Sequence, residues 1–122
     1  VEQVYGQLTD LLSEQGYVVN SIGQLPEFHP DVASDLVAAF SEAITNVLRH
    51  ASNKSVSISH TLTATHYQWR LVNSASGQTD RQGVGLKSMA RRAENHGGSA
   101  VFLVSAQGQA ELCLTLPSKV VI

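Results

Sequence analysis

The sequence predicts a two-layer α/β sandwich, in which about five strands form a mixed, mostly antiparallel sheet and three helices cover one face of it. Two observations support this fold class. The chain has 122 residues, the size of one domain, and 43% of them are hydrophobic, which is enough for a core. Its apolar periodicity changes between helical and strand spacing in the order helix, strand, helix, strand, strand, helix, strand, strand.

The first third of the chain predicts a helix, a strand and a loop. Over residues 1–15 four apolar side chains share one helical face, namely Val4, Leu8, Leu11 and Leu12. Gly16 is placed to end that helix. Residues 17–22 are rich in β-branched apolar side chains and predict a short strand. Residues 23–30 form a loop that contains two prolines, and Asp31 can cap the next helix.

The clearest element is a helix from residue 31 to about residue 52. At 100° per residue one broad face of this helix is apolar and consists of Leu36, Phe40, Ala43, Ile44, Val47 and Ala51. The opposite arc is polar and carries Glu42, Asn46, Arg49, His50 and Asn53. We expect the apolar face to pack in the core and the polar arc to meet solvent or a ligand.

The rest of the chain predicts a strand pair, a helix and a second strand pair. Residues 55–62 alternate apolar and hydroxyl side chains, as in a half-buried strand, and residues 66–72 form an antiparallel neighbour. Residues 74–82 are polar and predict a loop. Two final strands span residues 100–105 and 110–116, with a turn between them.

A third helix is expected from near Gly85 to His96, where Gly97-Gly98 end it. Its inner stripe consists of Leu86, Met89 and Ala93. Its outward side carries Lys87, Arg91 and Arg92, which are most simply a solvated basic face.

Composition excludes several functional classes. Eight basic and ten acidic residues give a formal net charge of -2, which argues against a general nucleic-acid binder. A single cysteine excludes a disulfide framework and a cysteine-rich metal site. No apolar run reaches about 18 residues, and no leader is visible, so we expect neither a membrane span nor a signal peptide. Because the chain begins with Val1 instead of Met, we expect a domain of a longer protein.

The polar stripe, defined as Glu42, Asn46 and His50, has a spacing of four residues and therefore follows one side of the second helix. Such a set can serve a hard metal ion and a phosphate chain, because Mg²⁺ prefers oxygen ligands and keeps substrate phosphates. Asn46 offers a neutral oxygen, and Glu42 can orient a water or accept a proton. Arg49 and His50 can approach the phosphate tail. Taken alone, the stripe is more simply explained as a solvated helix face.

The segment Gly83-Val84-Gly85-Leu86 is the second candidate feature. Glycine permits close approach of the backbone, and a helix that begins there directs unpaired N–H groups toward an anion such as phosphate. Taken alone, this segment is more simply an ordinary glycine-rich loop before a helix.

The two segments together are far more specific. Residues 42–51, EAITNVLRHA, resemble the N-box of histidine kinase ATP-binding domains. Residues 83–92, GVGLKSMARR, followed by Gly97-Gly98, resemble the second glycine box of that family and its helix. The form G-x-G-L-x-x-M-x-x-R is similar to the subfamily whose response regulators are of the nitrate-response type. Leu116-Pro117 resembles the end of the last strand in the family. The resemblance covers nearly the whole chain.

This resemblance implies the Bergerat-type ATP-binding sandwich, with ATP and Mg²⁺ as cofactors. It assigns Asn46 to Mg²⁺ that bridges the ATP phosphates, and Glu42 to an activating or positioning carboxylate beside it. Further nucleotide contacts fall on Arg49, His50, Asn73, Gly83, Val84, Gly85 and Leu86. The two glycines among them would frame the lid over the phosphates.

The resemblance also implies an enzyme, a histidine protein kinase, in the full-length protein. In the family a separate helical domain carries the histidine that is phosphorylated, and the phosphoryl group then passes to an aspartate of a response regulator. We therefore expect residues 1–122 to be a monomeric, cytoplasmic fragment that binds nucleotide without completing the reaction. The expected parent is a homodimer, for which the sequence leaves membrane anchoring open.

One departure from the family concerns the first glycine box, Asp-x-Gly-x-Gly, whose Asp accepts a hydrogen bond from the adenine amino group. Residues 73–77 are NSASG, so Asn73 replaces the Asp and Ala75 replaces the first Gly. A neutral acceptor is weaker than an ionised one, and we expect a loss on the order of 1 kcal/mol. Gln109-Ala110 also stand where the family has Gly-Thr. We therefore expect ATP binding that is weakened or lost.

Two alternatives remain open. The altered glycine box would suit a non-catalytic module that is kept for contacts with a partner. The N-box is also similar to that of the anti-sigma-factor serine kinases, although the pattern of residues 89–92 argues against that class. Among other candidates, His60 and His66 lack a third metal ligand, Trp69 is expected in the core, and Cys113 is expected to be a small buried hydrophobe.

Overall fold

The computed structural model describes residues 1–75 and 83–122, without the side chains of Ala75 and residues 83–85. The predicted loop over residues 74–82 lies mostly outside this part of the chain. The described residues form three α-helices, five strands and one short 3₁₀ helix. In chain order these are α1 (Glu2–Glu14), β1 (Val18–Ile22), α2 (Pro30–His50), β2 (Ala51–Leu62), β3 (His66–Ala75), α3 (Gly83–Glu94), β4 (Ser99–Val104), β5 (Gln109–Pro117) and η2 (Ser118–Val120).

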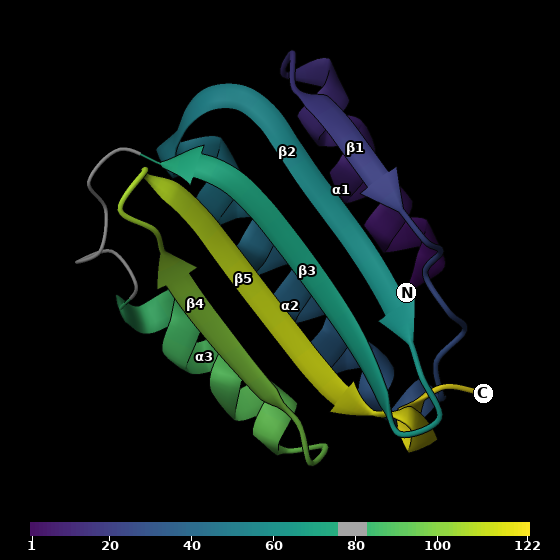
Figure 1. Ribbon diagram of the computed structural model, residues 1–122. Helices are drawn as coiled ribbons and strands as arrows, with labels where there is room; N and C mark the ends of the chain where they lie inside the picture. The colour runs from purple at the N-terminus through teal and green to yellow at the C-terminus, as the bar shows by residue number, and fades with distance from the viewer. Residues whose placement is uncertain (76–82) are drawn as a thin grey trace.

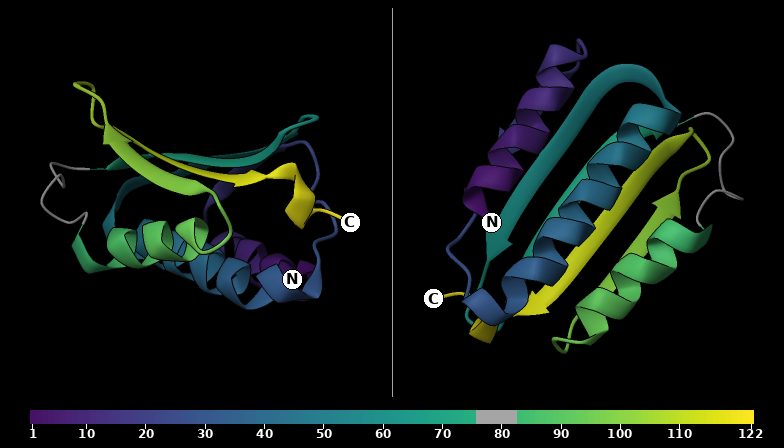
Figure 2. Two further views of the ribbon diagram at one scale, coloured as in Figure 1. Left: turned by 90° about the horizontal axis from the view of Figure 1, so that it is seen from below. Right: turned by 180° about the vertical axis from the view of Figure 1, so that it is seen from behind.

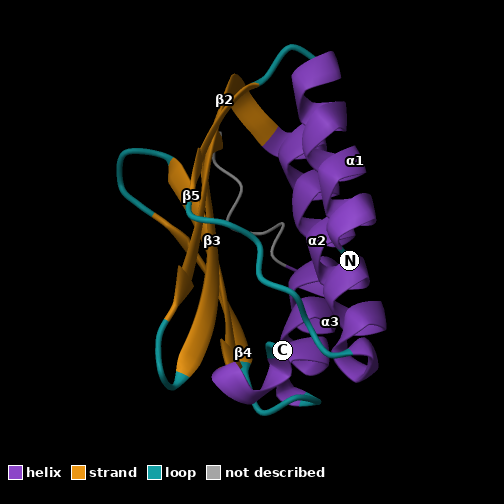
Figure 3. Cartoon of the chain, turned by 90° about the vertical axis from the view of Figure 1, so that its right-hand side faces the viewer, coloured by secondary structure: helices purple, strands orange, loops and turns teal. Residues whose placement is uncertain are grey.

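The five strands form one sheet in the order β1-β2-β3-β5-β4 (Figure 1). β1 runs parallel to β2, and the other three neighbouring pairs are antiparallel. All three helices lie on one face of the sheet, with α2 between α1 and α3 (Figures 2 and 3). The predicted two-layer sandwich with a mixed, mostly antiparallel sheet is therefore confirmed.

The core lies between α2 and the central strands. Five of the six apolar residues predicted for the inner face of α2 are buried, namely Leu36, Phe40, Ala43, Ile44 and Val47. Trp69 on β3 is fully buried, as expected, and its ring meets the Phe40 ring edge-on at 4.8 Å between centroids. β5 alternates buried and half-buried positions, because only one face of the sheet is covered by helices.

The first boundary that differs from expectation is the start of α2. Its N-cap is His29 and Pro30 occupies the first turn, so the prediction that Asp31 caps the helix is wrong. Proline suits the first helical position, since its missing N–H would have no helical partner there. Asp31 instead lies in the first turn, where a carboxylate interacts favourably with the helix dipole.

The other end of α2 also differs, because the chain leaves the helix at His50 and enters β2 directly at Ala51. Ala51 pairs with Ala75, the last residue of β3, and a register irregularity separates this pair from Val56↔Asn73. Asn53 therefore belongs to β2 and not to α2. Its side-chain amide donates a hydrogen bond to Ser74 Oγ at 3.1 Å. This pairing holds the end of α2 beside the end of β3.

The helix α3 ends at Glu94, close to the predicted end at His96. Gly97 has a φ of +81°, and the N–H groups of Gly97 and Gly98 donate to Glu94 O and Ala93 O at 3.1 and 2.9 Å. This pattern is a Schellman motif, in which glycine accepts the left-handed conformation. In the part of the chain that the structure covers, no helix combines the length and the apolar character that a membrane span requires.

Candidate functional site

The polar stripe of α2 is not a fully solvated helix face. Glu42, Asn46 and His50 are each half-buried, whereas Arg49 is exposed. The three stripe residues flank the apolar face of the helix, and their chemistry combines a carboxylate, an amide and an imidazole. Arg49 and His50 occupy the last turn of α2, where cationic side chains interact favourably with the helix dipole.

The stripe faces α3, as shown by the contacts of Asp35, which precedes the stripe on the same side of α2. Asp35 precedes Glu42 by seven residues, so it lies on the same side of α2 as the stripe. Its carboxylate contacts two side chains of the α3 region, Arg92 and His96. Because α2 and α3 run in opposite directions (Figure 2), the upper part of the stripe approaches the beginning of α3.

The glycine segment forms the first turn of α3. The helix begins at Gly83, two residues before the predicted start, so the segment 83–86 is helical and does not precede the helix as a loop. The first four N–H groups of a helix have no partner within it, and they carry the positive end of the dipole. No acidic residue lies in this turn to neutralise that end. Leu86 is half-buried and packs against the core, which anchors the turn.

Asn73 is the one buried polar side chain among the described residues, with 9% of its surface exposed. It pairs with Val56 on β2 and Ala110 on β5, which are both buried, so its side chain belongs to the helix-covered face. Its Nδ2 group donates a hydrogen bond to the Ser74 carbonyl at 3.0 Å. This bond sets the orientation of the amide.

Three sequence-predicted features therefore lie at one end of the molecule: the last turns of α2, the end of β3 with Asn73, and the first turn of α3 (Figures 1 and 2). The set includes the end of the stripe, Asn46 and His50. Glu42 lies one helical turn below Asn46. Ser76 and Gly77 of the altered glycine box lie outside the described residues.

The residues that the sequence interpretation missed are Asp35 and its two partners. Asp35 Oδ1 accepts a hydrogen bond from Arg92 Nη1 at 2.8 Å, and Asp35 Oδ2 lies 2.7 Å from His96 Nε2. The bond to His96, followed by the bond from Arg92, holds the pKa of Asp35 below its ordinary value. Arg92 is thus an ion-pair partner and not part of a solvated basic face. Two features of the sequence could have indicated this contact: Asp35 lies seven residues before Glu42, and Arg92 and His96 are four residues apart.

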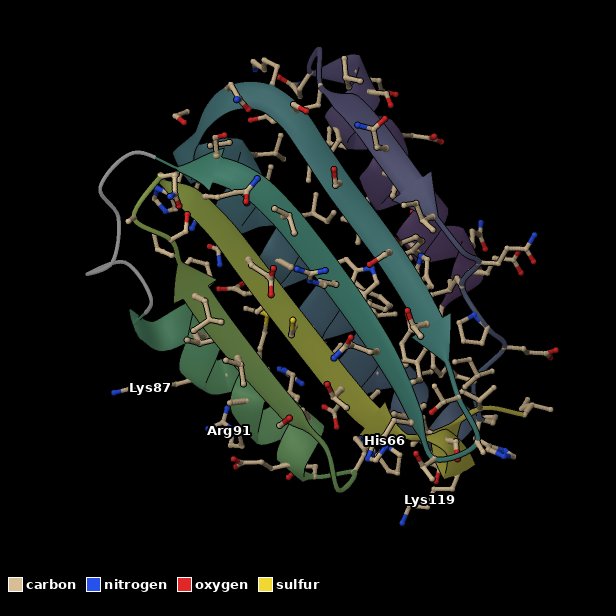
Figure 4. The ribbon with its side chains drawn as sticks, viewed as in Figure 1. His66, Lys87, Arg91 and Lys119 are labelled. Atoms are coloured by element: carbon tan, nitrogen blue, oxygen red, sulfur yellow. The ribbon has the colours of Figure 1, made fainter. Side chains whose placement is uncertain are left out.

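The remaining basic residues of α3 behave as expected. Lys87 and Arg91 are exposed and lie along α3 at the outer edge of the molecule (Figure 4). Leu86, Met89 and Ala93 form the inner stripe, with Met89 and Ala93 buried.

A second polar cluster lies on the open face of the sheet, away from the helices. Arg70 forms an ion pair with Glu111, which lowers the pKa of Glu111, and Cys113 contacts the same carboxylate. Burial is the main cause that raises the pKa of the Cys113 thiol, yet this residue is only half-buried. The expectation of a buried Cys113 is wrong, because the odd-numbered positions of β5 point to the uncovered face.

Metal ligation by the histidine pair is not supported. Over residues 1–75 and 83–122 no group of three or more His, Cys, Asp or Glu side chains could hold a metal ion. His60 instead lies between Tyr5 and Tyr67, at 3.3 and 2.8 Å from their hydroxyl oxygens.

Comparison with known proteins identifies the fold. No family model and no curated protein sequence matches the chain. Among solved structures, the histidine kinase AdeS of Acinetobacter baumannii matches with a TM-score of 0.74 at 12% identity, covering 96% of this chain and 62% of that one. The catalytic domain of histidine kinase ThkA, in a nucleotide-free form, matches with a TM-score of 0.73 at 12% identity over 96% of this chain and 92% of its own.

The mycobacterial sensor histidine kinase MprB matches with a TM-score of 0.68 at 14% identity, covering 95% of this chain and 94% of that one. The chain has the fold of histidine kinase catalytic domains. It spans less than two thirds of the AdeS chain but nearly all of the ThkA and MprB chains. At these identities the likeness establishes the fold alone.

Proposed function

We propose that residues 1–122 are the ATP-binding catalytic domain of a two-component sensor histidine kinase. The observation that carries this proposal is the meeting of the polar stripe, the buried amide of Asn73 and the first turn of α3 at one end of this fold. An amide acceptor, hard oxygen ligands and unpaired backbone N–H groups are what a purine, a divalent cation and a phosphate chain require.

Asn73 is the proposed partner of the adenine amino group. Its amide nitrogen already donates to Ser74 O, so the side-chain oxygen is the end suited to a ligand that donates. The amino group of adenine is a donor, whereas guanine presents an acceptor at the same ring position. The orientation of this amide therefore favours adenine.

Asn46 is the proposed protein ligand of Mg²⁺, and Glu42 is the proposed activating or positioning carboxylate beside it. Both offer hard oxygen atoms, they are half-buried, and they lie one turn apart on α2. This donor set fits Mg²⁺, which usually takes one or two protein ligands together with substrate phosphates, so a larger cluster of acidic side chains is not required. When bound, Mg²⁺ neutralises charge that develops on the phosphates.

The phosphate chain is assigned to the first turn of α3, at Gly83, Val84, Gly85 and Leu86. The N–H groups of this turn bind anions, and glycine leaves room for close approach of the backbone. Arg49, at the end of α2, supplies positive charge near the phosphates, and the half-buried imidazole of His50 beside it offers a hydrogen-bonding group.

The phosphoryl acceptor is proposed to be a histidine on a dimerisation domain that is separate from this chain. A response regulator, of the nitrate-response type on the evidence of residues 83–92, would then receive the group on an aspartate. In this scheme the domain binds, orients and shields ATP, and the catalysis of phosphoryl transfer rests on positioning and electrostatics.

The direct test is calorimetric titration of the protein with ATP in the presence of Mg²⁺. We expect binding by the native sequence and a loss of at least about tenfold in affinity for Asn46→Ala, since one metal ligand is worth at least 1.4 kcal/mol. Asn20→Ala, at an exposed position of β1, is the matched control and should bind as the native chain does. Absence of any binding by the native chain would favour the non-catalytic module instead.

A further inference from the structure

The carboxylate of Asp35 joins α2 to the end of α3 through two side chains. Its oxygens lie 2.8 Å from Arg92 Nη1 and 2.7 Å from His96 Nε2. The side chains of Asp35, Arg92 and His96 are 24%, 33% and 18% exposed, so the cluster is partly shielded from water. Shielding and two charge-assisted bonds make this contact stronger than an ordinary surface ion pair.

The contact restrains α3 in two ways. Arg92 lies in the last turn of α3 and His96 two residues after its end at Glu94, so both reach a single carboxylate only at one rotation and one height of α3 relative to α2. His96 is itself held in place by the Schellman motif that follows, because Gly98 N–H bonds to Ala93 O and a side chain at Gly98 would meet the Thr115 carbonyl at 2.1 Å. A slip of α3 by one residue would turn it by about 100° and break both bonds.

The same contact determines how α2 and α3, which both contribute to the proposed nucleotide site, are aligned along their axes. Asn46 lies eleven residues after Asp35 on α2, which corresponds to about 16 Å of helix. Gly83 lies nine residues before Arg92 on α3, which corresponds to about 14 Å and differs from that length by less than one helical turn. Since the two helices run in opposite directions, the contact at Asp35 brings Asn46 level with the first turn of α3 (Figure 2).

We propose that Asp35 is a positioning residue of the nucleotide site: through Arg92 and His96 it holds α3 in the register that presents its first turn to the phosphates beside Asn46. This inference rests on the proposed function. Asp35 lies three helical turns from the site and does not contact the ligand in this proposal, so its effect on binding is transmitted by α3.

The experiment measures nucleotide affinity and the amide hydrogen exchange of α3 in the same variants. Asp35→Asn keeps the size of the side chain and removes its charge. Arg70→Gln is the control, because it breaks an ion pair on the open face of the sheet, away from α3. Both variants are assayed at a temperature at which urea titration shows that they are folded.

We expect Asp35→Asn to raise the Kd for ATP with Mg²⁺ about five- to tenfold and to speed amide exchange along residues 86–94. Arg70→Gln should change the Kd less than twofold and leave exchange in α3 unaltered. Asp35→Glu should recover most of the affinity, and Arg92→Gln should add little to the effect of Asp35→Asn, because both act on one contact. If Asp35→Asn does not fold, Arg92→Gln alone, which leaves the bond to His96, replaces it.

Native affinity in both Asp35→Asn and Arg92→Gln would overturn the inference. If the native chain itself does not bind ATP, the proposed function fails, and hydrogen exchange then decides the role of Asp35 separately. Faster exchange in α3 of Asp35→Asn would still support positioning by Asp35, and unchanged exchange would refute it.

Discussion

Asn73 is buried, so replacing its amide by a carboxylate would affect both the stability of the fold and the proposed binding of adenine. Its Nδ2 group donates a hydrogen bond to the Ser74 carbonyl, so its side-chain oxygen is the atom that can accept a hydrogen bond from a ligand. A carboxylate there would accept more strongly from an adenine amino group but would lose the bond to Ser74 O. Under the proposed function, Asn73 therefore trades affinity for adenine against stability of the fold.

This trade leads to a prediction for Asn73→Asp. We expect its affinity for ATP with Mg²⁺ to rise several-fold, about 1 kcal/mol, and its free energy of unfolding without nucleotide to fall by about 1–3 kcal/mol. Calorimetry measures the first change and urea titration the second. Asn20→Asp adds the same charge at an exposed position and should alter neither. Equal or weaker binding by Asn73→Asp would contradict the placement of Asn73 against adenine.

At the level of elements, the glycine at the end of α3 is required for packing, whereas the glycine within α1 is not. A Cβ at Gly98 would lie 2.1 Å from the Thr115 carbonyl oxygen and 2.9 Å from Leu116 Cδ2. A Cβ at Gly6 would meet no atom within 4 Å, and Gly6 is inside a helix. The same substitution should therefore have opposite effects at the two positions.

We expect Gly98→Ala to lower the free energy of unfolding by about 1–3 kcal/mol, since backbone atoms must move apart. Gly6→Ala should raise it by about 0.5–1 kcal/mol, because alanine loses less conformational entropy in a helix. Urea titration of both variants checks the pair. An unchanged free energy of unfolding in Gly98→Ala would contradict this expectation and show that the turn before β4 can shift away from Thr115.

For the whole molecule, a half-buried histidine, His60, links α1 to the sheet through hydrogen bonds. Trp69 Nε1 donates to the Tyr5 hydroxyl, which lies 3.3 Å from His60 Nε2, and His60 Nδ1 lies 2.8 Å from the Tyr67 hydroxyl. Burial lowers the pKa of His60, so the folded state favours the neutral ring. The unfolded chain then binds more protons as the pH falls below the ordinary histidine value of about 6.5.

The sign of the pH dependence follows directly. The stability that neutral His60 contributes is present above about pH 6.5 and is lost as the pH falls toward the lowered pKa of the folded state. We expect the free energy of unfolding to decrease between pH 7.5 and 5.5, and His60→Gln to weaken this dependence. Urea titration at both pH values checks it, with His66→Gln, at the exposed end of the same hairpin, as the control. An identical slope in His60→Gln and the native chain would contradict this account.

Much of the fold could be predicted because it depends on local patterns. The apolar spacing of α2 and the alternation at Val56 and Ile58 of β2 each record which side of an element is buried, and the buried residues agree with that record. Boundaries were less predictable, because Ala51 leaves the helix to pair with Ala75, a partner distant in sequence. The side of β5 that carries Cys113 likewise depends on which face of the sheet the helices cover.

The sequence by itself determined the elements, their order and the candidate chemistry at Glu42, Asn46, His50 and Gly83-Val84-Gly85-Leu86, because residue type and short-range spacing are local properties. Only the tertiary structure decided that Asn73 is buried, that the polar stripe faces α3, and that Asp35 holds Arg92 and His96. These three facts depend on how two antiparallel helices and a sheet pack together. Such packing is set by contacts between residues as much as 61 positions apart, which no local pattern records.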